Sequence, residues 1–236
     1  MRKIHKRDES EMSLLNDIVV EATAKDADLT RLLRLCLVLG ARLKYAPLQR
    51  WVKNELNGYA LTDVLPPYRQ LAVINRGEFV GQMETRQFDI PLSIIPTEFR
   101  SRYESAELRD SIAEYVYLAN GLTDGKKLCI PWPVEIAMLE ASKLVHGGQC
   151  RRAWMEISCA GLVGMLDQVK SKVLGFALDI EAEAPNAGEI DGLKVPMQLS
   201  SINQIFITNI SGQVGAVQTG NQSTSNAQML SVADAD

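Results

Sequence analysis

An acid-any-lysine tripeptide, Asp124-Gly125-Lys126, is the arrangement in this sequence that comes nearest to the chemistry of a metal-dependent nuclease. Such enzymes hold a divalent cation with carboxylates and keep a lysine beside the attacking water. Asp110 or Glu114 would supply the upstream carboxylate. The tripeptide is also a common polar turn, and it arises easily by chance in a chain with 23% charged residues. We favour the turn and keep a metal-dependent nuclease-type toxin as the alternative.

Other catalytic and cofactor-binding templates are not met. The sequence has no GxSxG, HExxH, GxGxxG or EF-hand pattern. The stretch from Gly121 to Lys127 is near to a phosphate-binding loop, but three residues instead of four separate its glycines, and a lysine replaces the magnesium-binding Ser or Thr. Two histidines, and four cysteines without a CxxC pair, leave little material for a metal site. We therefore expect no catalytic residue, no metal and no cofactor.

Five residues between positions 51 and 69 combine large apolar surfaces with an acid and a base: Trp51, Glu55, Tyr59, Tyr68 and Arg69. The Arg69 guanidinium has the geometry to fork onto the Glu55 carboxylate, and each tyrosine presents an apolar body with a polar tip. This group would fasten a helical hairpin to the region that follows it. The same residues would also line a ligand pocket centred on Glu55 and Arg69. We favour the fastening role and keep the ligand pocket as the alternative.

A basic stretch without acids extends from residue 29 to residue 54. In a helix, Arg31, Arg34 and Arg42 lie within an arc of about 80°, at 100° per residue. Such an arc is most simply a solvated face. It would also bind phosphate groups, and this keeps a nucleic-acid or nucleotide sensor as a further alternative.

Hydrophobic periodicity and turn residues predict the elements that position these groups. Pro66 and Pro67 exclude a helix where they stand, and short strands are expected after them. The predicted helices are 12–25, 29–45, 47–57, 106–118, 133–147 and 149–184, and the predicted strands lie within 70–100 and at 128–130. The predicted fold class is α+β and predominantly helical: a helical hairpin, a small β region and a long helix, followed by a β-rich C-terminal tail.

The end of the chain differs in composition, because residues 195–233 carry no charge. Residues 185–199 mix Pro, Gly and Asn, and they predict a linker between a domain at 1–184 and a tail at 200–236. β-Branched residues predict strands in this tail at 202–210 and further on at 213–219.

Self-association is the interpretation that we favour for this tail. Asn and Gln side chains stack in register, and no like charges oppose the stacking. We expect a β-mediated homo-oligomer of fixed size, with an open fibre or a disordered end as alternatives. The residues expected to carry the association are Ile205, Ile207, Ile210, Val214, Val217, Gln218, Gly220 and Asn221.

Length and composition exclude several classes of protein. The 236 residues are 46% hydrophobic, as in ordinary globular proteins. A net charge of −4 has the wrong sign for a dedicated nucleic-acid coat. No apolar run reaches the roughly 18 residues of a transmembrane helix, and no apolar signal segment follows the charged N-terminus. A cytoplasmic protein with reduced thiols is therefore expected.

The segment from Trp51 to Tyr59, which ends in ELNGY, and the PPYR element at 66–69 together resemble the abortive-infection AbiTii domain family. Members show a tryptophan, a helix ending in E-L-x-G-Y and a P-x-Y-R element in this order, after a leucine-rich helix like 29–45. The segment around Trp154 also resembles the later part of the family, so the likeness covers about residues 10 to 184. The resemblance implies a role in bacterial defence against phage, and it implies no catalytic residue.

The stretch 210–221 is similar to the short amyloid-type signalling motifs of microbial immune proteins, which share a hydrophobic-Gln-x-Gly core with Asn nearby. These features together predict a non-enzymatic anti-phage protein that self-associates through its C-terminal β segment. A partner protein of the same defence system is a further expectation.

Overall fold

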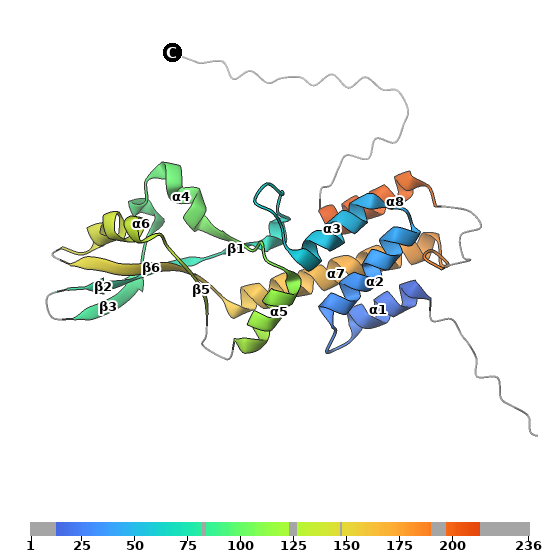
Figure 1. Cartoon of the computed structure of the whole chain (residues 1–236), viewed down its shortest axis with the longest axis horizontal. Helices are drawn as coiled ribbons and strands as arrows, with labels where there is room; N and C mark the ends of the chain where they lie inside the picture. Colours follow the sequence, from blue (N-terminus) through green and yellow to red (C-terminus); the bar gives the residue numbers. More distant parts are fainter. Residues whose placement is uncertain (1–12, 82–83, 123–126, 147, 190–196, 213–236) are drawn as a thin grey trace, which may run out of the picture.

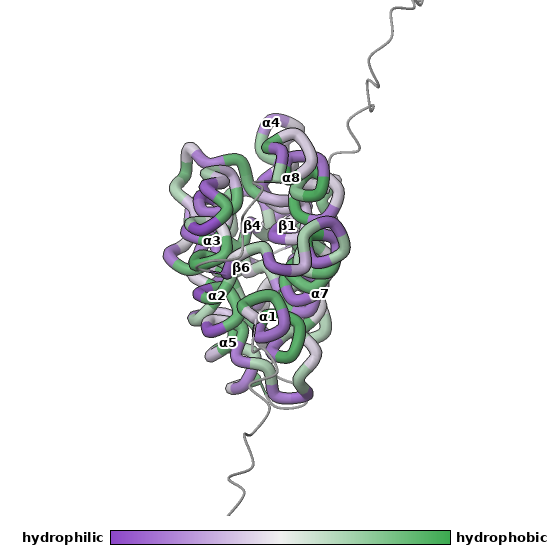
Figure 2. The backbone as a smooth tube through the Cα atoms, turned by 90° about the vertical axis from the view of Figure 1, so that its right-hand side faces the viewer, coloured by the Kyte–Doolittle hydropathy of each residue, from purple (hydrophilic) through white to green (hydrophobic). Residues whose placement is uncertain are grey.

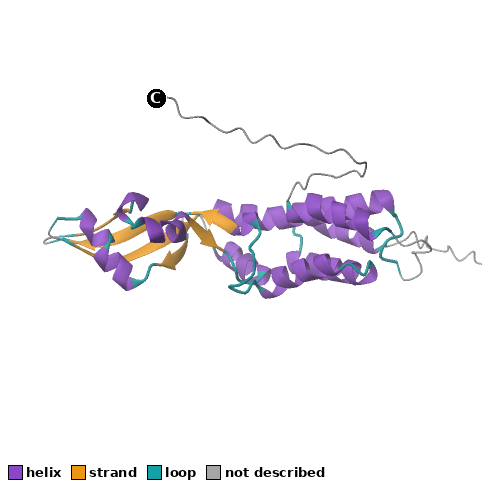
Figure 3. Cartoon of the chain, turned by 90° about the horizontal axis from the view of Figure 1, so that it is seen from above, coloured by secondary structure: helices purple, strands orange, loops and turns teal. Residues whose placement is uncertain are grey.

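The computed structural model describes residues 13–81, 84–122, 127–146, 148–189 and 197–212. The protein is elongated, with a bundle of helices at one end and a sheet with short helices at the other (Figures 1 and 3). The α-helices are α1 (Leu14–Thr23), α2 (Leu29–Arg42), α3 (Ala46–Asn57), α4 (Thr97–Glu104), α5 (Ile112–Gly121), α6 (Val134–Leu139), α7 (Cys159–Glu183) and α8 (Leu199–Phe206). The strands are β1 (Gln70–Ala72), β2 (Ile74–Val80), β3 (Thr85–Asp89), β4 (Ser105–Glu107), β5 (Leu128–Pro131) and β6 (Gln149–Ile157).

Short helical turns complete the chain: η1 (Pro67–Arg69), η2 (Leu92–Ile94), η3 (Ala141–Leu144) and the π-helical η4 (Ile207–Ser211). The fold is α+β and predominantly helical, which confirms the predicted class. Within the described ranges, no helix has both the length and the apolar character needed to cross a membrane.

Side-chain caps fix where the bundle helices begin. Ser13, Asp28, Ser111 and Ser158 precede α1, α2, α5 and α7, and each accepts a hydrogen bond of 3.0 to 3.3 Å from a backbone N–H in the first turn. Each such cap stabilises its helix by about 1 kcal/mol. Helix α3 instead has Pro47 in its first turn, where a missing N–H leaves no hydrogen bond unmade. The predicted helices at 12–25 and 29–45 are therefore present with slightly shorter ends, and the helix predicted at 47–57 begins one residue earlier.

One large apolar core holds the bundle together. Leu32 and Leu39 of α2 and Phe176 of α7 are buried at its centre, together with apolar side chains of α1, α3, α5 and α8. Seen along the long axis from the helical end, the helices nearest the viewer carry both hydrophobic and hydrophilic residues (Figure 2). This is the pattern that a helix with one buried stripe requires.

The predicted long helix at 149–184 is wrong in its first part. Residues 149–157 form β6, and α7 begins only after the cap at Ser158. In β6, Cys150 and Ala153 are buried, and the strand hydrogen-bonds to β2 on one side and β5 on the other. The spacing of the buried positions in this short segment is close to that of a helix, and strand pairing with residues far away in the sequence overrides it.

In the described part of the chain, the larger sheet has the strand order β3-β2-β6-β5, with all neighbours antiparallel. A second apolar cluster covers one face of this sheet. It joins Phe79 and Ala153 of the sheet to Tyr103 of α4 and to Ala137 of α6. The buried Asn75 amide donates to the Tyr103 carbonyl (2.8 Å) and accepts from the Trp132 indole (3.2 Å), so it ties α4 to the sheet.

The helix predicted at 106–118 begins later than expected. Residues 105–107 form β4, which pairs with β1 in a separate ladder, and α5 starts at Ile112. Pairing of Leu71 with Ala106 brings the chain back beside the bundle between the two ends of the molecule. The short ladder therefore positions the backbone carbonyls that follow β4.

The strand predicted at 202–210 is also wrong, because these residues form α8 and η4. Ile202, Ile205 and Ile210 are buried against the bundle core. Three buried isoleucines on one helical stripe outweigh their β propensity, because each fully buried side chain contributes about 1.5–3 kcal/mol. Residues 199–211 are therefore packed as part of the helical body.

Polar contacts add to this packing of α8 and η4. The Tyr45 hydroxyl donates to Asn203 Oδ1 (2.8 Å), and Lys172 Nζ of α7 donates to the carbonyl of Ile210 (3.0 Å). Asn209 Nδ2 donates to Asp179 Oδ2 at 2.7 Å. The last described turn of the chain is thus held against α7 by its buried Ile210 and by hydrogen bonds to Lys172 and Asp179.

The residues predicted for self-association divide accordingly. Ile205 and Ile210 are buried inside their own chain, and Ile207 lies half-buried in η4. Their role as strand residues is therefore wrong. The other five, and the strand predicted at 213–219, lie outside the described residues: Val214, Val217, Gln218, Gly220 and Asn221.

Candidate functional site

The five residues predicted from 51 to 69 lie together in the interior, where α3 meets η1. Glu55 and Arg69 are both fully buried. Arg69 donates from Nε to Glu55 Oε1 (3.2 Å) and from a terminal nitrogen to Glu55 Oε2 (2.7 Å). The Tyr59 and Tyr68 hydroxyls each donate to Glu55 Oε1 at 2.7 Å. The fork that the sequence predicted is therefore present, and the carboxylate accepts four hydrogen bonds.

The cluster extends beyond the ion pair. The Trp51 indole donates to the Tyr68 hydroxyl (2.8 Å), and the other terminal nitrogen of Arg69 donates to the carbonyls of Leu108 (2.7 Å) and Asp110 (2.8 Å). The Tyr59 ring lies under the guanidinium, with its centroid 4.8 Å from the central carbon. Arg69 thereby joins α3 to the segment that leads from β4 into α5.

The electrostatics of the cluster keep it in one ionisation state. Burial, together with the neighbouring Glu55 charge, raises the pKa of Tyr59 and of Tyr68 well above the usual range. Burial alone would lower the pKa of Arg69, but hydrogen bonds to Glu55 and its charge raise it above its ordinary value. The tyrosines stay neutral donors and the guanidinium stays charged.

No buried side-chain nitrogen or oxygen of the described residues is without a hydrogen-bond partner. In the cluster, every nitrogen and hydroxyl that donates already has a protein acceptor. We therefore interpret Trp51, Glu55, Tyr59, Tyr68 and Arg69 as a structural fastening, because a ligand would have to displace bonds that are already made.

The outer face of the larger sheet, which α4 and α6 leave open, carries a second group of polar side chains. Strand register places Trp154 of β6 between Arg76 of β2 and Pro131 of β5. The same register places Glu78 beside Arg152 and Gln87. This arrangement was missed from the sequence, since residues 149–157 were assigned to a helix. Cys150 and Ala153 are three positions apart, as on a helix, because an irregularity in the β2–β6 pairing interrupts the strand alternation there, so the sequence offered no clear signal.

Ion pairs connect the charged groups of this outer face. Glu78 accepts from Arg152 (2.7 Å), and Arg76 donates to Asp89 (2.8 Å). Glu156 accepts from the Trp154 indole (3.1 Å) and from Lys127. A terminal nitrogen of Arg76 lies 3.6 Å from Glu156 Oε1.

The two glutamates of the outer face stay ionised. The hydrogen bond from Arg152 lowers the pKa of Glu78 below its ordinary value. Burial would raise the pKa of Glu156, but the hydrogen bonds from Lys127 and Trp154 outweigh it and lower the pKa. The face is therefore a surface of fixed charges around one indole ring.

The predicted basic arc on α2 has separate partners. Arg31 lies 3.2 Å from Glu21 of α1, and Arg42 donates to the carbonyl of Gly188. Arg34 is exposed on the same helix. Two of the three guanidinium groups thus have partners within the chain.

The acids proposed for a nuclease have other partners. Glu114 accepts from the Ser111 hydroxyl (2.8 Å) while its backbone N–H donates back to Ser111, which forms a capping box for α5. Asp110 accepts from the Tyr115 hydroxyl at 3.2 Å. Asp124, Gly125 and Lys126 lie outside the described residues. Among the described residues, no group of three or more His, Cys, Asp or Glu is arranged to hold a metal ion.

Comparison with known proteins identifies the family. The family model that matches is AbiTii, and it covers residues 13–205. No curated protein and no solved structure matched the chain. The matched range includes the Glu55–Arg69 cluster, the outer sheet face and most of α8. Since it spans most of the 236 residues, the chain belongs to the AbiTii family, and this membership implies abortive-infection defence against phage.

Proposed function

We propose that this AbiTii-family protein acts in anti-phage defence by binding rather than by catalysis, and that it self-associates through the uncharged segment after Gly212. The observation that carries the proposal is the composition of residues 213–233, which follow the last described turn of the chain. The body extends through η4, where Ile210 is buried. From residue 213 to residue 233 the chain then carries no charge.

The composition of this segment supports association with copies of itself. It contains Val214 and Val217 together with many Asn, Gln, Ser and Thr residues, and it lacks the charges that oppose in-register stacking. Because Ile205 and Ile210 are engaged within their own chain, the association is assigned to Val214, Val217, Gln218, Gly220 and Asn221.

The ionisation of the outer sheet face supports action without catalysis. A general acid or base needs a pKa near the working pH. The pKa values of Glu78 and Glu156 are instead lowered by the cations that face them. Both carboxylates are therefore suited to fixing the side chains around them.

Light scattering on purified protein tests the self-association. We expect the full chain to form an oligomer, and both a chain ending at Gly212 and the Val214→Asp/Val217→Asp double variant to have the mass of one subunit. The truncation point matters, because ending the chain before α8 would expose the core that Ile202 and Ile205 cover.

A matched control is Val20→Asp on α1, since Val20 is 58% exposed and lies in the charged body. This variant should keep the oligomer mass. A full chain that is monomeric, or a truncated chain with an unchanged number of subunits, would overturn the proposed self-association.

A further inference from the structure

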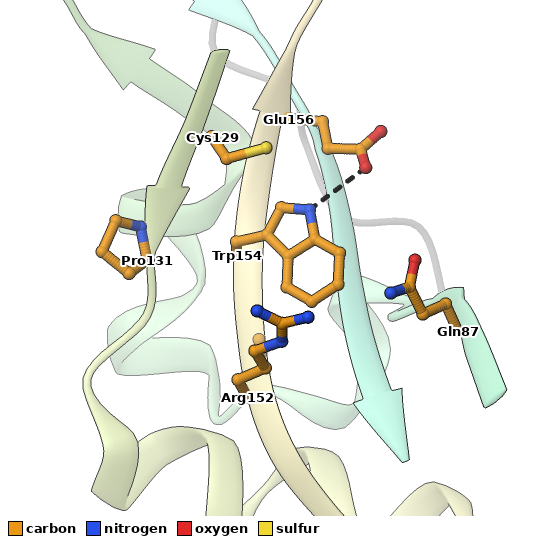
Figure 4. A pocket seen from close by; sticks show the side chains of 7 residues that line it. Gln87, Cys129, Pro131, Arg152, Trp154 and Glu156 are labelled. Carbon is orange, nitrogen blue, oxygen red and sulfur yellow. Dashed lines mark hydrogen bonds between the residues drawn. The ribbon is translucent and has the colours of Figure 1, made fainter. Parts of the chain in front are cut away.

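The outer face of the larger sheet is hollowed around Trp154. The hollow has a volume of about 410 Å³ and is open to solvent (Figure 4). The residues that line it come from β3, β5 and β6: Gln87, Cys129, Pro131, Arg152, Ala153, Trp154 and Glu156. Its size lies within the range of small-molecule sites in proteins.

Trp154 is held in one orientation at the centre of this hollow. Its indole nitrogen donates to Glu156 Oε1 at 3.1 Å, and the Arg152 guanidinium carbon lies 5.6 Å from the ring centroid (Figure 4). The ring is only half-buried, and Pro131 stands opposite it on β5. A fixed and accessible indole is a stacking platform for a planar ring.

Polar groups surround this platform with both donors and acceptors. Gln87 is exposed, and its amide nitrogen donates to Glu78 Oε2 at 3.5 Å, which leaves one N–H and the amide oxygen for a ligand. The exposed Arg152 adds guanidinium donors. The buried Glu156 carboxylate accepts from Trp154 and Lys127, so the acceptor offered to a ligand is the Gln87 amide oxygen. The edges of nucleobases present this mixture of donors and acceptors, and proteins read them beside an aromatic ring.

Cations exceed carboxylates around the hollow. Among the described residues, the cations are Arg76, Lys127, Arg151 and Arg152, and the facing acids are Glu78, Asp89 and Glu156. The side chains of Arg151 and Arg152 are 73% and 65% exposed. A smaller hollow of about 170 Å³, lined by Lys127 and Ser158, shares Glu156 with the first. The excess charge is positive, as a phosphate-bearing ligand requires.

We infer that the hollow around Trp154 binds a nucleobase, stacked on the indole, from a mononucleotide or from a single-stranded nucleic acid. The phosphate of either source would be attracted by Arg152 and Lys127. None of the residues that line this hollow belongs to the segment after Gly212, so the inference does not depend on the proposed self-association.

Binding to the full chain tests the inference. The probes are AMP and CMP, measured by calorimetry, and short fluorescein-labelled oligo(A) and oligo(C) RNA strands, measured by fluorescence anisotropy at low salt. Trp154→Ala should weaken binding about 5- to 150-fold, the range for losing one stacked base. Trp154→Phe keeps an aromatic ring and should restore most of the affinity.

Two further variants keep the test decisive. Gln87→Ala changes an exposed side chain, so this variant should fold normally and still bind the probes more weakly than the wild type. It therefore tests the site even if Trp154→Ala yields little folded protein. Arg31→Ala/Arg34→Ala on α2 is the matched control and should leave binding unchanged. Mononucleotide binding would identify a free nucleotide as the source, and binding of the oligonucleotides alone would identify a single strand.

The inference is overturned by any of three results. These are no binding of any probe to the wild-type chain at low salt, equal binding by wild type and a folded Trp154→Ala variant, or loss of binding only in the α2 arginine variant.

Discussion

Replacing Glu55 by Gln removes one charge from the interior and changes the volume very little. Glu55 Oε1 accepts from Tyr59, Tyr68 and Arg69, and Oε2 accepts from Arg69 alone. An amide in this position keeps one acceptor oxygen. In either orientation the NH2 group faces a donor of Arg69, which is Nε at the Oε1 position and a terminal nitrogen at the Oε2 position. Turning the amide therefore cannot restore the fork.

The magnitude follows from the burial of the remaining charge. Glu55 is the carboxylate that pairs with Arg69 in the cluster, so Glu55→Gln leaves the guanidinium without an opposite charge there. Arg69 is fully buried, so solvent cannot compensate for this loss. Removing one partner of a buried ion pair costs about 3–5 kcal/mol. For a chain of this size, each kcal/mol lowers the melting temperature by about 2–4 °C. We therefore expect a decrease of roughly 6 to 20 °C.

Thermal and urea unfolding followed by circular dichroism measure this effect. The matched control is Glu107→Gln, since Glu107 pairs with Arg109 at 2.9 Å but its side chain is 52% exposed. An exposed pair contributes at most about 1 kcal/mol. If Glu55→Gln melts as the control does, the fastening interpretation is refuted and the ligand-pocket alternative gains support.

Two further predictions concern α7 and the outer sheet face. A Cβ on Gly175 would lie 2.5 Å from Asn209 Oδ1, so Gly175→Ala should disturb the Asn209–Asp179 hydrogen bond and lower the melting temperature by a few degrees. The control is Gly164→Ala, whose Cβ would meet nothing within 4 Å and which should not lower the melting temperature. Equal effects of the two substitutions would contradict the docking of η4 on α7. The pKa of Glu156 is lowered in the folded state, so its stabilisation is present above its unfolded pKa of about 4.3 and is lost as the pH falls through its folded pKa. Melting temperatures from about pH 5 to about pH 3 should therefore fall less steeply in Glu156→Gln than in the wild type, and parallel curves would contradict the ion pairs assigned to Glu156.

The sequence was sufficient for features that depend on neighbouring residues. Apolar periodicity and turn residues located α1, α2 and α3, and the combination of Glu55, Arg69 and two tyrosines predicted the fork between the two charged groups. These interactions are set by residue type and short separations, which a single sequence displays directly.

Features that depend on distant partners were not predictable in the same way. The isoleucines of α8 favour a strand by propensity, and only the core that they cover makes them helical. The site around Trp154 joins Gln87, Pro131 and Arg152 through strand register. No local pattern in the sequence shows that these three residues meet.

Plaque counts on bacteria that carry the gene test the central claim most directly, namely defence that depends on association after Gly212. The strains to compare express the intact chain, the Val214→Asp/Val217→Asp variant and the Val20→Asp control at equal levels. We predict that the intact chain and the control reduce plaque numbers alike and that the double variant loses this protection. Full protection by a double variant that is shown to be monomeric would contradict the claim.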